Sequence, residues 1–208
     1  MPLADILNNY RTSINEVSQT LNIAFTVDAG GLYTYPQNQR DFIIESCFLK
    51  FFITWESFLE DAFVSFLLGE VPIVGAAVLR HATPLDRSHA GKMLIGTQKY
   101  VDWANPQIVR RLSTLYFDQN NPINNTLLSI EPDIFDLKTI RNAAAHISST
   151  TSAELDALAT RKLRAPCTNY TVSRLILSFD PSAAVNNQTI FTTYLSLLDA
   201  AAQSISNG

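Results

Sequence analysis

Apolar residues recur at three- and four-residue intervals along most of the chain, which is the pattern of amphipathic helices. The first stripe comprises Ile6, Leu7, Tyr10, Ile14, Val17 and Leu21. A second stripe runs from Ile44 to Phe66. It begins shortly after Pro36 and stops at Gly69 and Pro72, residue types that start and end helices. The pattern therefore predicts two long helices, the second of about thirty residues.

Capping residues predict shorter helices in the rest of the chain. Asn105-Pro106 and Asn121-Pro122 each place an asparagine cap before a proline at the first helical position. A capping box is predicted at Thr151, and Asn186 or Asn187 is expected to cap the last helix. The predicted segments are 89–102, 106–117, a helix opened by Pro132, 152–164, 170–179, where a strand is the alternative, and 187–206. The expected fold is all-α: one domain over residues 1–208, an up-and-down helical bundle with additional short helices.

Composition narrows the class of protein. Hydrophobic residues make up 47% of the chain and charged residues 16%, which excludes a disordered chain and favours an oligomer with a buried face. The apolar segments are interrupted by charges, so no membrane helix is expected. The start, "MPLADILNNY", does not resemble a signal or transit segment, and we expect a cytoplasmic protein. A net charge of −4 argues against broad duplex binding but leaves a local nucleic-acid cleft open.

Several catalytic classes have no motif in this sequence. It contains no phosphate loop, dinucleotide fingerprint, zinc-protease helix or hydrolase elbow. Cys47 and Cys167 lack metal-ligand spacing and are predicted to be small buried thiols. His81 and His89 have no partner at metal or triad spacing, so we expect them at the surface. No metal ion or cofactor is expected.

The remaining candidate chemistry lies in "DLKTIRNAAAHISSTT", residues 136–151. On a regular helix its buried stripe would comprise Leu137, Ile140, Ala144 and Ile147. Asn142 and His146 then project from the opposite face, one turn apart, and Arg141 lies ~140° from His146 around the helix. A single helix can direct Arg141 and His146 at the same atom only if the helix distorts or the arginine side chain bends. Because Ala143–Ala145 add little bulk, a second copy can approach closely, and we expect a site shared by two copies.

Such a site suits metal-independent cleavage of RNA. A histidine can take the proton of a ribose 2′-hydroxyl or give one to the leaving 5′-oxygen, and an arginine can stabilise charge on the phosphorane. The asparagine can orient the ring or bind a phosphate oxygen. DNA would be inert, because the nucleophile is the 2′-hydroxyl. The alternative is a solvated arginine and histidine on a surface helix, since this spacing also arises by chance.

The segment "RNAAAH" resembles the R-x-x-x-x-H signature of the HEPN superfamily. The upstream segment "FFITWESFLEDAF", residues 51–63, is similar to the long second helix of those proteins, especially in the branch called RiboL-PSP-HEPN. The resemblance covers residues 36–165 and leaves out the predicted C-terminal helix, 187–206. It implies a helical bundle that dimerises through the motif helix and cuts RNA without a metal or cofactor, leaving a 2′,3′-cyclic phosphate and a 5′-hydroxyl.

The resemblance also implies roles for single residues and for partners. Arg141, Asn142 and His146 carry over as catalytic residues, and Glu56 as an acidic residue near the site. Many members of the superfamily are toxins or antiviral-defence effectors, often encoded with an antitoxin or another regulatory protein. Others have lost activity, so the alternative function is a non-catalytic, all-helical interaction module.

Basic residues near the motif are candidates for binding the RNA strand. Those assigned to this rim are Lys138, Arg161, Lys162 and Arg164. The alternative is that the cations near the end of the 152–164 helix complement its dipole. A third interpretation, a small-ligand or nucleotide site on the aromatic second helix, lacks a phosphate-binding loop.

Overall fold

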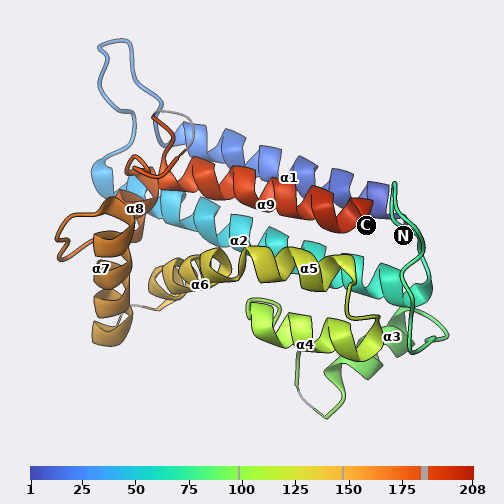
Figure 1. Ribbon diagram of the computed structural model, residues 1–208. Coiled ribbons are helices and arrows are strands. Elements are labelled where there is room, and N and C mark those ends of the chain that lie inside the picture. Colours follow the sequence, from blue (N-terminus) through green and yellow to red (C-terminus); the bar gives the residue numbers. More distant parts are fainter. Residues whose placement is uncertain (98, 147, 184–186) are drawn as a thin grey trace. The chain divides into compact units, whose positions relative to one another are not determined.

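The computed structural model describes residues 1–97, 99–146, 148–183 and 187–208. Within these ranges the chain forms nine α-helices and 67% of it is helical, so the all-α prediction is confirmed (Figure 1). In chain order the helices are α1 (Leu3–Ile23), α2 (Gln37–Leu68), α3 (Arg87–Ile95), α4 (Pro106–Tyr116), α5 (Pro122–Ser129), α6 (Glu131–Ala145), α7 (Ser149–Leu163), α8 (Val172–Leu177) and α9 (Ile190–Asn207). No helix in the described ranges is both long and apolar enough to cross a membrane.

The helices divide into two compact units. Unit 1 comprises residues 1–11, 54–135 and 198–208, and unit 2 comprises residues 12–53 and 136–197. Four helices, α1, α2, α6 and α9, each supply residues to both units. The expectation of one domain stays a prediction.

Aromatic side chains of α2 form the core of unit 1. The Phe63 ring lies 4.9 Å from the Phe117 ring and 5.7 Å, edge to face, from the Trp103 ring, measured between centroids. Trp55 stacks on Phe58 with a centroid separation of 5.6 Å and is fully buried. Such pairs stabilise a core by more than the area they bury. The aromatic stripe of the second predicted helix is therefore explained by packing.

The short helices α4 and α5 start at the predicted caps. The Asn105 side chain accepts the Gln107 N–H at 3.1 Å, and the Asn121 side chain accepts the Asn124 N–H at 2.9 Å. A proline follows each cap at the first helical position, where its missing N–H costs no hydrogen bond. The two helices pack beside each other (Figure 1). Local capping chemistry was thus sufficient to locate both.

Glu131, at the start of α6, is bonded to two residues of α4. Its carboxylate accepts a hydrogen bond from the Gln107 side chain at 2.9 Å and pairs with the Arg110 guanidinium. These bonds, the one from Gln107 first, hold the pKa of Glu131 below its ordinary value. The ionised carboxylate therefore stabilises the fold above the ordinary pKa of roughly 4.3, and this contribution is lost as pH falls through the lower folded pKa.

We expect Glu131→Gln to unfold at a lower urea concentration than the unmodified protein at about pH 7, with the difference shrinking towards about pH 3. Circular dichroism at a series of pH values measures the two midpoints. Glu154→Gln is the matched control, because Glu154 is an exposed glutamate of α7, and its midpoint should follow the unmodified protein throughout. A difference that stays constant over this range would contradict a role for the Glu131 charge.

The core of unit 2 is built from α2, α9 and α6. Phe51 of α2 packs edge to face against Phe191 of α9, with ring centroids 5.4 Å apart and planes at 83°. Phe48 lies one turn before Phe51 and is also fully buried. From α6 come Leu137 and Ile140, which are both 0% exposed. The buried side of the motif helix is therefore the one that the apolar spacing predicts.

A buried carboxylate joins three helices in unit 2. The Asp136 side chain on α6 is 8% exposed and pairs with the Arg161 guanidinium and, at 2.9 Å, with the Lys162 ammonium, both on α7. The Tyr194 hydroxyl of α9 donates to the same carboxylate at 3.3 Å. Burying a charge is costly unless it is paired and hydrogen-bonded. Asp136 therefore ties α7 and α9 to the helix that carries the motif.

Three predicted segments differ in detail. Helix α3 is shorter than the predicted 89–102, because Gly96 ends it with a φ of 55°. The segment 170–179 is helical over the residues of α8. Of the two predicted caps of α9, Asn186 lies outside the described residues, and Asn187 has a φ of 68° instead of the extended backbone of a cap. Thr189 takes that place: its hydroxyl accepts the Thr192 N–H at 3.2 Å.

Candidate active site

The motif residues lie in the last turn of α6 and directly after it. The helix ends at Ala145, and the His146 backbone N–H donates to the Asn142 carbonyl at 2.9 Å, which keeps His146 one turn from Asn142. Arg141 Nη1 donates to Asn142 Oδ1 at 3.3 Å. The arginine side chain thus bends towards the asparagine, so that a cation and an amide meet at the end of the helix.

The side chains of the motif differ in exposure. His146 is exposed, and Arg141 and Asn142 are half-buried. The histidine is therefore not part of the core, in agreement with the helical spacing. Ala144, from the predicted buried stripe, is half-buried, and Ile147, the last residue of that stripe, lies outside the described residues.

The connection from α6 to α7 is capped differently from the prediction. The cap of α7 is Ser148, whose side chain accepts the Thr151 N–H at 3.1 Å. Thr151 completes a capping box, since its hydroxyl accepts the Ser148 N–H at 3.1 Å. A threonine hydroxyl here does what a glutamate side chain does in the usual box. The prediction of a cap at Thr151 was wrong, and the helix starts three residues earlier, at Ser149.

Thr151 also fixes the backbone of the candidate histidine. Its hydroxyl donates to the His146 carbonyl oxygen at 2.7 Å. That bond engages the main chain and leaves the imidazole nitrogens to other partners. The structure therefore holds the position from which the His146 ring projects, while the ring itself is at the surface.

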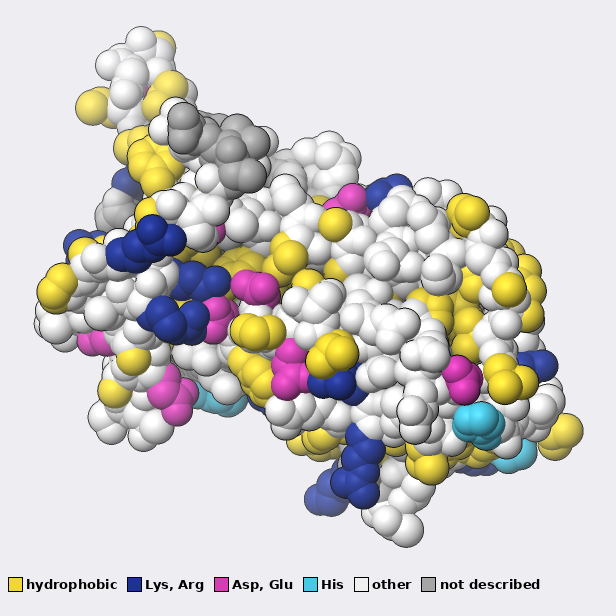
Figure 2. Space-filling view, in the orientation of Figure 1, with side chains coloured by type: hydrophobic (Ala, Val, Ile, Leu, Met, Phe, Trp, Pro, Cys, Tyr) yellow, Lys and Arg dark blue, Asp and Glu magenta, His cyan; other side chains and the backbone are white. Residues whose placement is uncertain are grey.

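The residues of the predicted basic rim differ in how exposed their side chains are. The Lys162 side chain is 18% exposed and bound to Asp136, whereas the Arg161 side chain is 60% exposed although it pairs with the same carboxylate. Figure 2 shows Lys and Arg side chains next to Asp and Glu side chains over α7 and α8. Arg164 is exposed at the end of α7, and Lys138 is half-buried on α6. Their contact with RNA stays a prediction.

Glu56, which the resemblance assigns to the neighbourhood of the site, is half-buried on α2. It belongs to unit 1, whereas Arg141, Asn142 and His146 belong to unit 2. Its place beside the motif stays a prediction. The acidic residue of α2 that lies in the same unit as the motif helix and shares a cavity wall with it is Glu45.

A cavity of about 200 Å³ opens beside the motif helix in unit 2. The residues that line it include Glu45 of α2, Ala143 and Ala144 of α6, Thr151 and Leu155 of α7, and Tyr170. Burial raises the pKa of Glu45, although the Ser173 N–H that donates to the carboxylate acts in the opposite direction. This site was not predicted from the sequence, because its wall comes from distant segments. The one local signal was an acidic residue directly beside Ile44, a buried residue of the apolar stripe.

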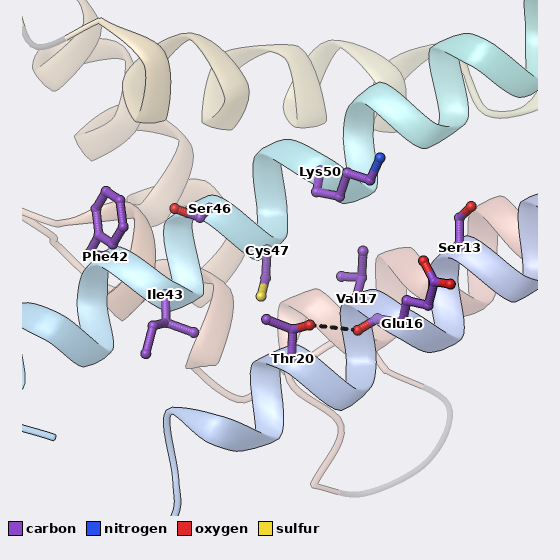
Figure 3. A pocket seen from close by; sticks show the side chains of 9 residues that line it. All are labelled: Ser13, Glu16, Val17, Thr20, Phe42, Ile43, Ser46, Cys47 and Lys50. Carbon is purple, nitrogen blue, oxygen red and sulfur yellow. Dashed lines mark hydrogen bonds between the residues drawn. The ribbon is translucent and has the colours of Figure 1, made fainter. Parts of the chain in front are cut away.

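A second cavity, of about 430 Å³, lies between α1 and the first half of α2 in unit 2 (Figure 3). Val17, Ile43 and Cys47 line it, and the Cys47 sulfur points between the two helices. Burial raises the pKa of this thiol, which keeps it protonated and unreactive, as expected of a packing residue. Cys47 and Cys167 are both free and buried, as predicted. The surface of this cleft is mostly apolar, and Ser13, Glu16 and Lys50 also line it.

The other two histidines, His81 and His89, belong to no metal site in the part of the chain that the structure describes. Among the described residues, no group of three or more His, Cys, Asp or Glu side chains is arranged to hold a metal ion. His81 and His89 are exposed, as predicted. The His89 ring has a local role, since its Nδ1 accepts the Leu85 N–H at 3.2 Å. The motif of α6 remains the strongest candidate for catalysis.

Comparison with models of known protein families, with curated proteins and with solved structures finds no match to this chain. The resemblance to the HEPN motif therefore rests on the residues of the sequence. A function has to be argued from the last turn of α6 and from the groups around it.

Proposed function

We propose that the protein is a metal-independent endoribonuclease that cuts RNA through attack of a ribose 2′-hydroxyl on the adjacent phosphorus. The products carry a 2′,3′-cyclic phosphate and a 5′-hydroxyl. The active form in this proposal is a homodimer through α6. A role as a toxin or antiviral-defence effector in the cytoplasm, held in check by an antitoxin or regulatory protein, follows from the same resemblance.

One observation carries the proposal: a cation and an amide in the last turn of α6 are followed directly by an exposed imidazole. Arg141 is bonded to Asn142, and His146 is held one turn further on by its backbone bond to the Asn142 carbonyl. Phosphoryl transfer needs stabilisation of negative charge and groups that move protons, and these residue types supply both. Ala145, which is exposed beside His146, adds little bulk where a second copy of the helix would approach.

In the proposed reaction, one histidine ring removes the proton of the 2′-hydroxyl. The 2′-oxygen then forms a bond to phosphorus while the bond from phosphorus to the 5′-oxygen breaks, and the same ring gives the proton to the departing 5′-oxygen. Each site of the dimer takes this histidine, His146, from one chain. Arg141 stabilises the charge on the phosphorane, and Asn142 orients the ring or a phosphate oxygen.

The protein incubated with a mixed RNA pool in excess EDTA is expected to fragment the RNA and to leave DNA of the same sequence intact. His146→Ala should lower the rate by about 10²–10⁴-fold, the usual contribution of a general acid or base. Gel analysis gives the rates, and the chemistry of the new ends identifies the cyclic phosphate.

His81→Ala is the matched control, since it removes another exposed histidine and should leave the rate unchanged. Intact RNA after incubation with the unmodified protein would overturn the proposal. So would equal cleavage by the protein and its His146→Ala variant. Cleavage that stops in EDTA and resumes with added Mg²⁺ would overturn its metal independence.

The second candidate, a non-catalytic interaction module, is favoured by exposed apolar side chains in unit 2. Leu32 is 71% exposed and Tyr33 53% on the loop 24–36, drawn in light blue in Figure 1, and Phe42 at the edge of the α1–α2 cleft is 71% exposed. Large exposed apolar side chains are a feature of interaction sites when they gather into a patch. This candidate predicts that the unmodified protein leaves RNA intact, so the same assay decides between the two.

A further inference from the structure

Glu45 brings a carboxylate with spare hydrogen-bonding capacity to the wall of the cavity beside the motif helix. Burial raises its pKa, the Ser173 backbone N–H lowers it, and the nearby charge of Asp41 raises it. A carboxylate has about four lone-pair sites, so a single backbone donor leaves several of them for a ligand. The ligand that suits this wall therefore presents N–H donors to it.

The remainder of the wall suits a flat ring. Tyr170 supplies an aromatic side chain and Leu155 an apolar one. The Asp156 carboxylate accepts the N–H groups of Asn169 and Tyr170 at 3.0 and 2.8 Å, which fixes the backbone that carries the Tyr170 ring. The Arg174 guanidinium lies 4.1 Å from the centroid of that ring. Aromatic side chains held in this way are the platforms on which single-stranded bases stack.

The size of the cavity limits the ligand to one ring system. Its volume of about 200 Å³ is below the ~300–1,000 Å³ of sites for drug-sized molecules. A single base fits such a space better than a longer ligand does.

The cavity and the candidate catalytic residues share part of their surroundings. Thr151 lines the cavity, and its hydroxyl is the group that donates to the His146 carbonyl at 2.7 Å. On α6, Ala143 lines the cavity and directly follows Asn142. All of these residues belong to unit 2. A base bound in the cavity would thus belong to a nucleotide beside the motif.

We propose that this cavity is a base subsite that selects guanine in the RNA substrate, an inference that rests on the proposed ribonuclease function. Guanine carries two adjacent donors on its Watson–Crick edge, N1–H and the N2 amino group, and one carboxylate accepts both. Adenine and cytosine present an amino group beside a ring acceptor, and uracil presents one N–H between two carbonyls, so each sets an acceptor against the carboxylate. Glu45 is the specificity residue and Tyr170 the stacking residue.

Cleavage of an RNA with all four bases randomised, followed by sequencing of the new 5′-hydroxyl ends, tests the subsite. The unmodified protein should prefer guanosine beside the cut by on the order of tenfold, as expected for one bidentate base contact. Glu45→Gln keeps an acceptor for the Ser173 N–H but sets an amino donor against guanine, so cleavage at guanosine should fall to the level of the other nucleotides. Glu154→Gln, an exposed glutamate outside the cavity wall, should keep the preference.

A binding measurement separates the two proposals and needs no variant. Guanosine 3′-monophosphate should bind the unmodified protein about tenfold more tightly than the adenosine, cytidine and uridine 3′-monophosphates in calorimetry. Equal binding of the four nucleotides, or cutting without base preference, overturns the guanine subsite and leaves the ribonuclease standing. Selective guanosine binding by a protein that never cuts RNA overturns the ribonuclease and still supports the base site.

Discussion

Mixing equal amounts of the Arg141→Ala and His146→Ala proteins should restore RNA cleavage that neither variant shows alone. Because the two side chains diverge by ~140° on a regular helix, each site of a two-fold dimer through α6 would take the arginine from one chain and the histidine from the other. A mixed dimer then has one complete site and one site lacking both groups. Random exchange makes about half of the dimers mixed, so the rate should recover to about a quarter of the unmodified rate.

The mixture is prepared by dissociating the chains in mild denaturant and diluting them together, and cleavage is followed on gels. The control mixture pairs His146→Ala with the double variant Arg141→Ala/His146→Ala, which forms the same dimers but has no complete site. If differently tagged chains co-purify and the rate still does not recover, arginine and histidine act within one chain. A chain that stays monomeric at all concentrations would contradict the shared site itself.

Asp136→Ala should be the most destabilising single change at a charged residue of unit 2, lowering the free energy of unfolding by about 3 kcal/mol. Removing one partner of a buried ion pair typically costs about 3–5 kcal/mol, because the other charge is left uncompensated. The lower end applies here, since the Arg161 side chain is 60% exposed and can be solvated, whereas Lys162 is 18% exposed and cannot easily be. Urea unfolding followed by circular dichroism gives the difference.

The double variant Asp136→Ala/Lys162→Met shows whether the loss of the contact between Asp136 and the Lys162 ammonium is the cause. It removes the half-buried charge that loses its contact with Asp136 in the single variant, and should therefore recover part of the lost stability. Asp5→Ala, at an exposed aspartate of α1, is the control and should cost less than about 1 kcal/mol. If the double variant loses as much free energy of unfolding as the two single variants together, the pairing of Asp136 with Lys162 is contradicted.

The helices were predictable because their signals are local. Apolar spacing located the buried stripe that includes Phe48 and Phe66, and an asparagine followed by a proline marked the starts of α4 and α5. The start of α7 was misplaced because Ser148 and Thr151 both suit a cap, and the choice depends on where the preceding helix ends. Local patterns therefore predict reliably that a helix exists. They predict less well which of several nearby hydroxyl residues caps it.

Contacts between distant segments could not be predicted in the same way. The sequence suggested RNA binding or a helix-dipole role for Arg161 and Lys162, but their ion pair with Asp136, some 25 residues earlier, exists only in the folded unit. The cavity around Glu45 joins residues more than one hundred positions apart. Helical spacing did predict that His146 faces away from the core, because that depends on one helix alone.

The hydrogen bond between Arg141 and Asn142 has a consequence for the resting charge of the site. An aspartate at this position would hold the guanidinium as firmly but would neutralise it, and an incoming phosphate would have to compete with a carboxylate. The asparagine is a neutral acceptor, held at 3.3 Å, so it orients the arginine and leaves its full positive charge in place. In the proposed reaction the phosphate replaces the Asn142 amide as the hydrogen-bond partner of the Arg141 guanidinium. No ion pair has to be broken for this exchange.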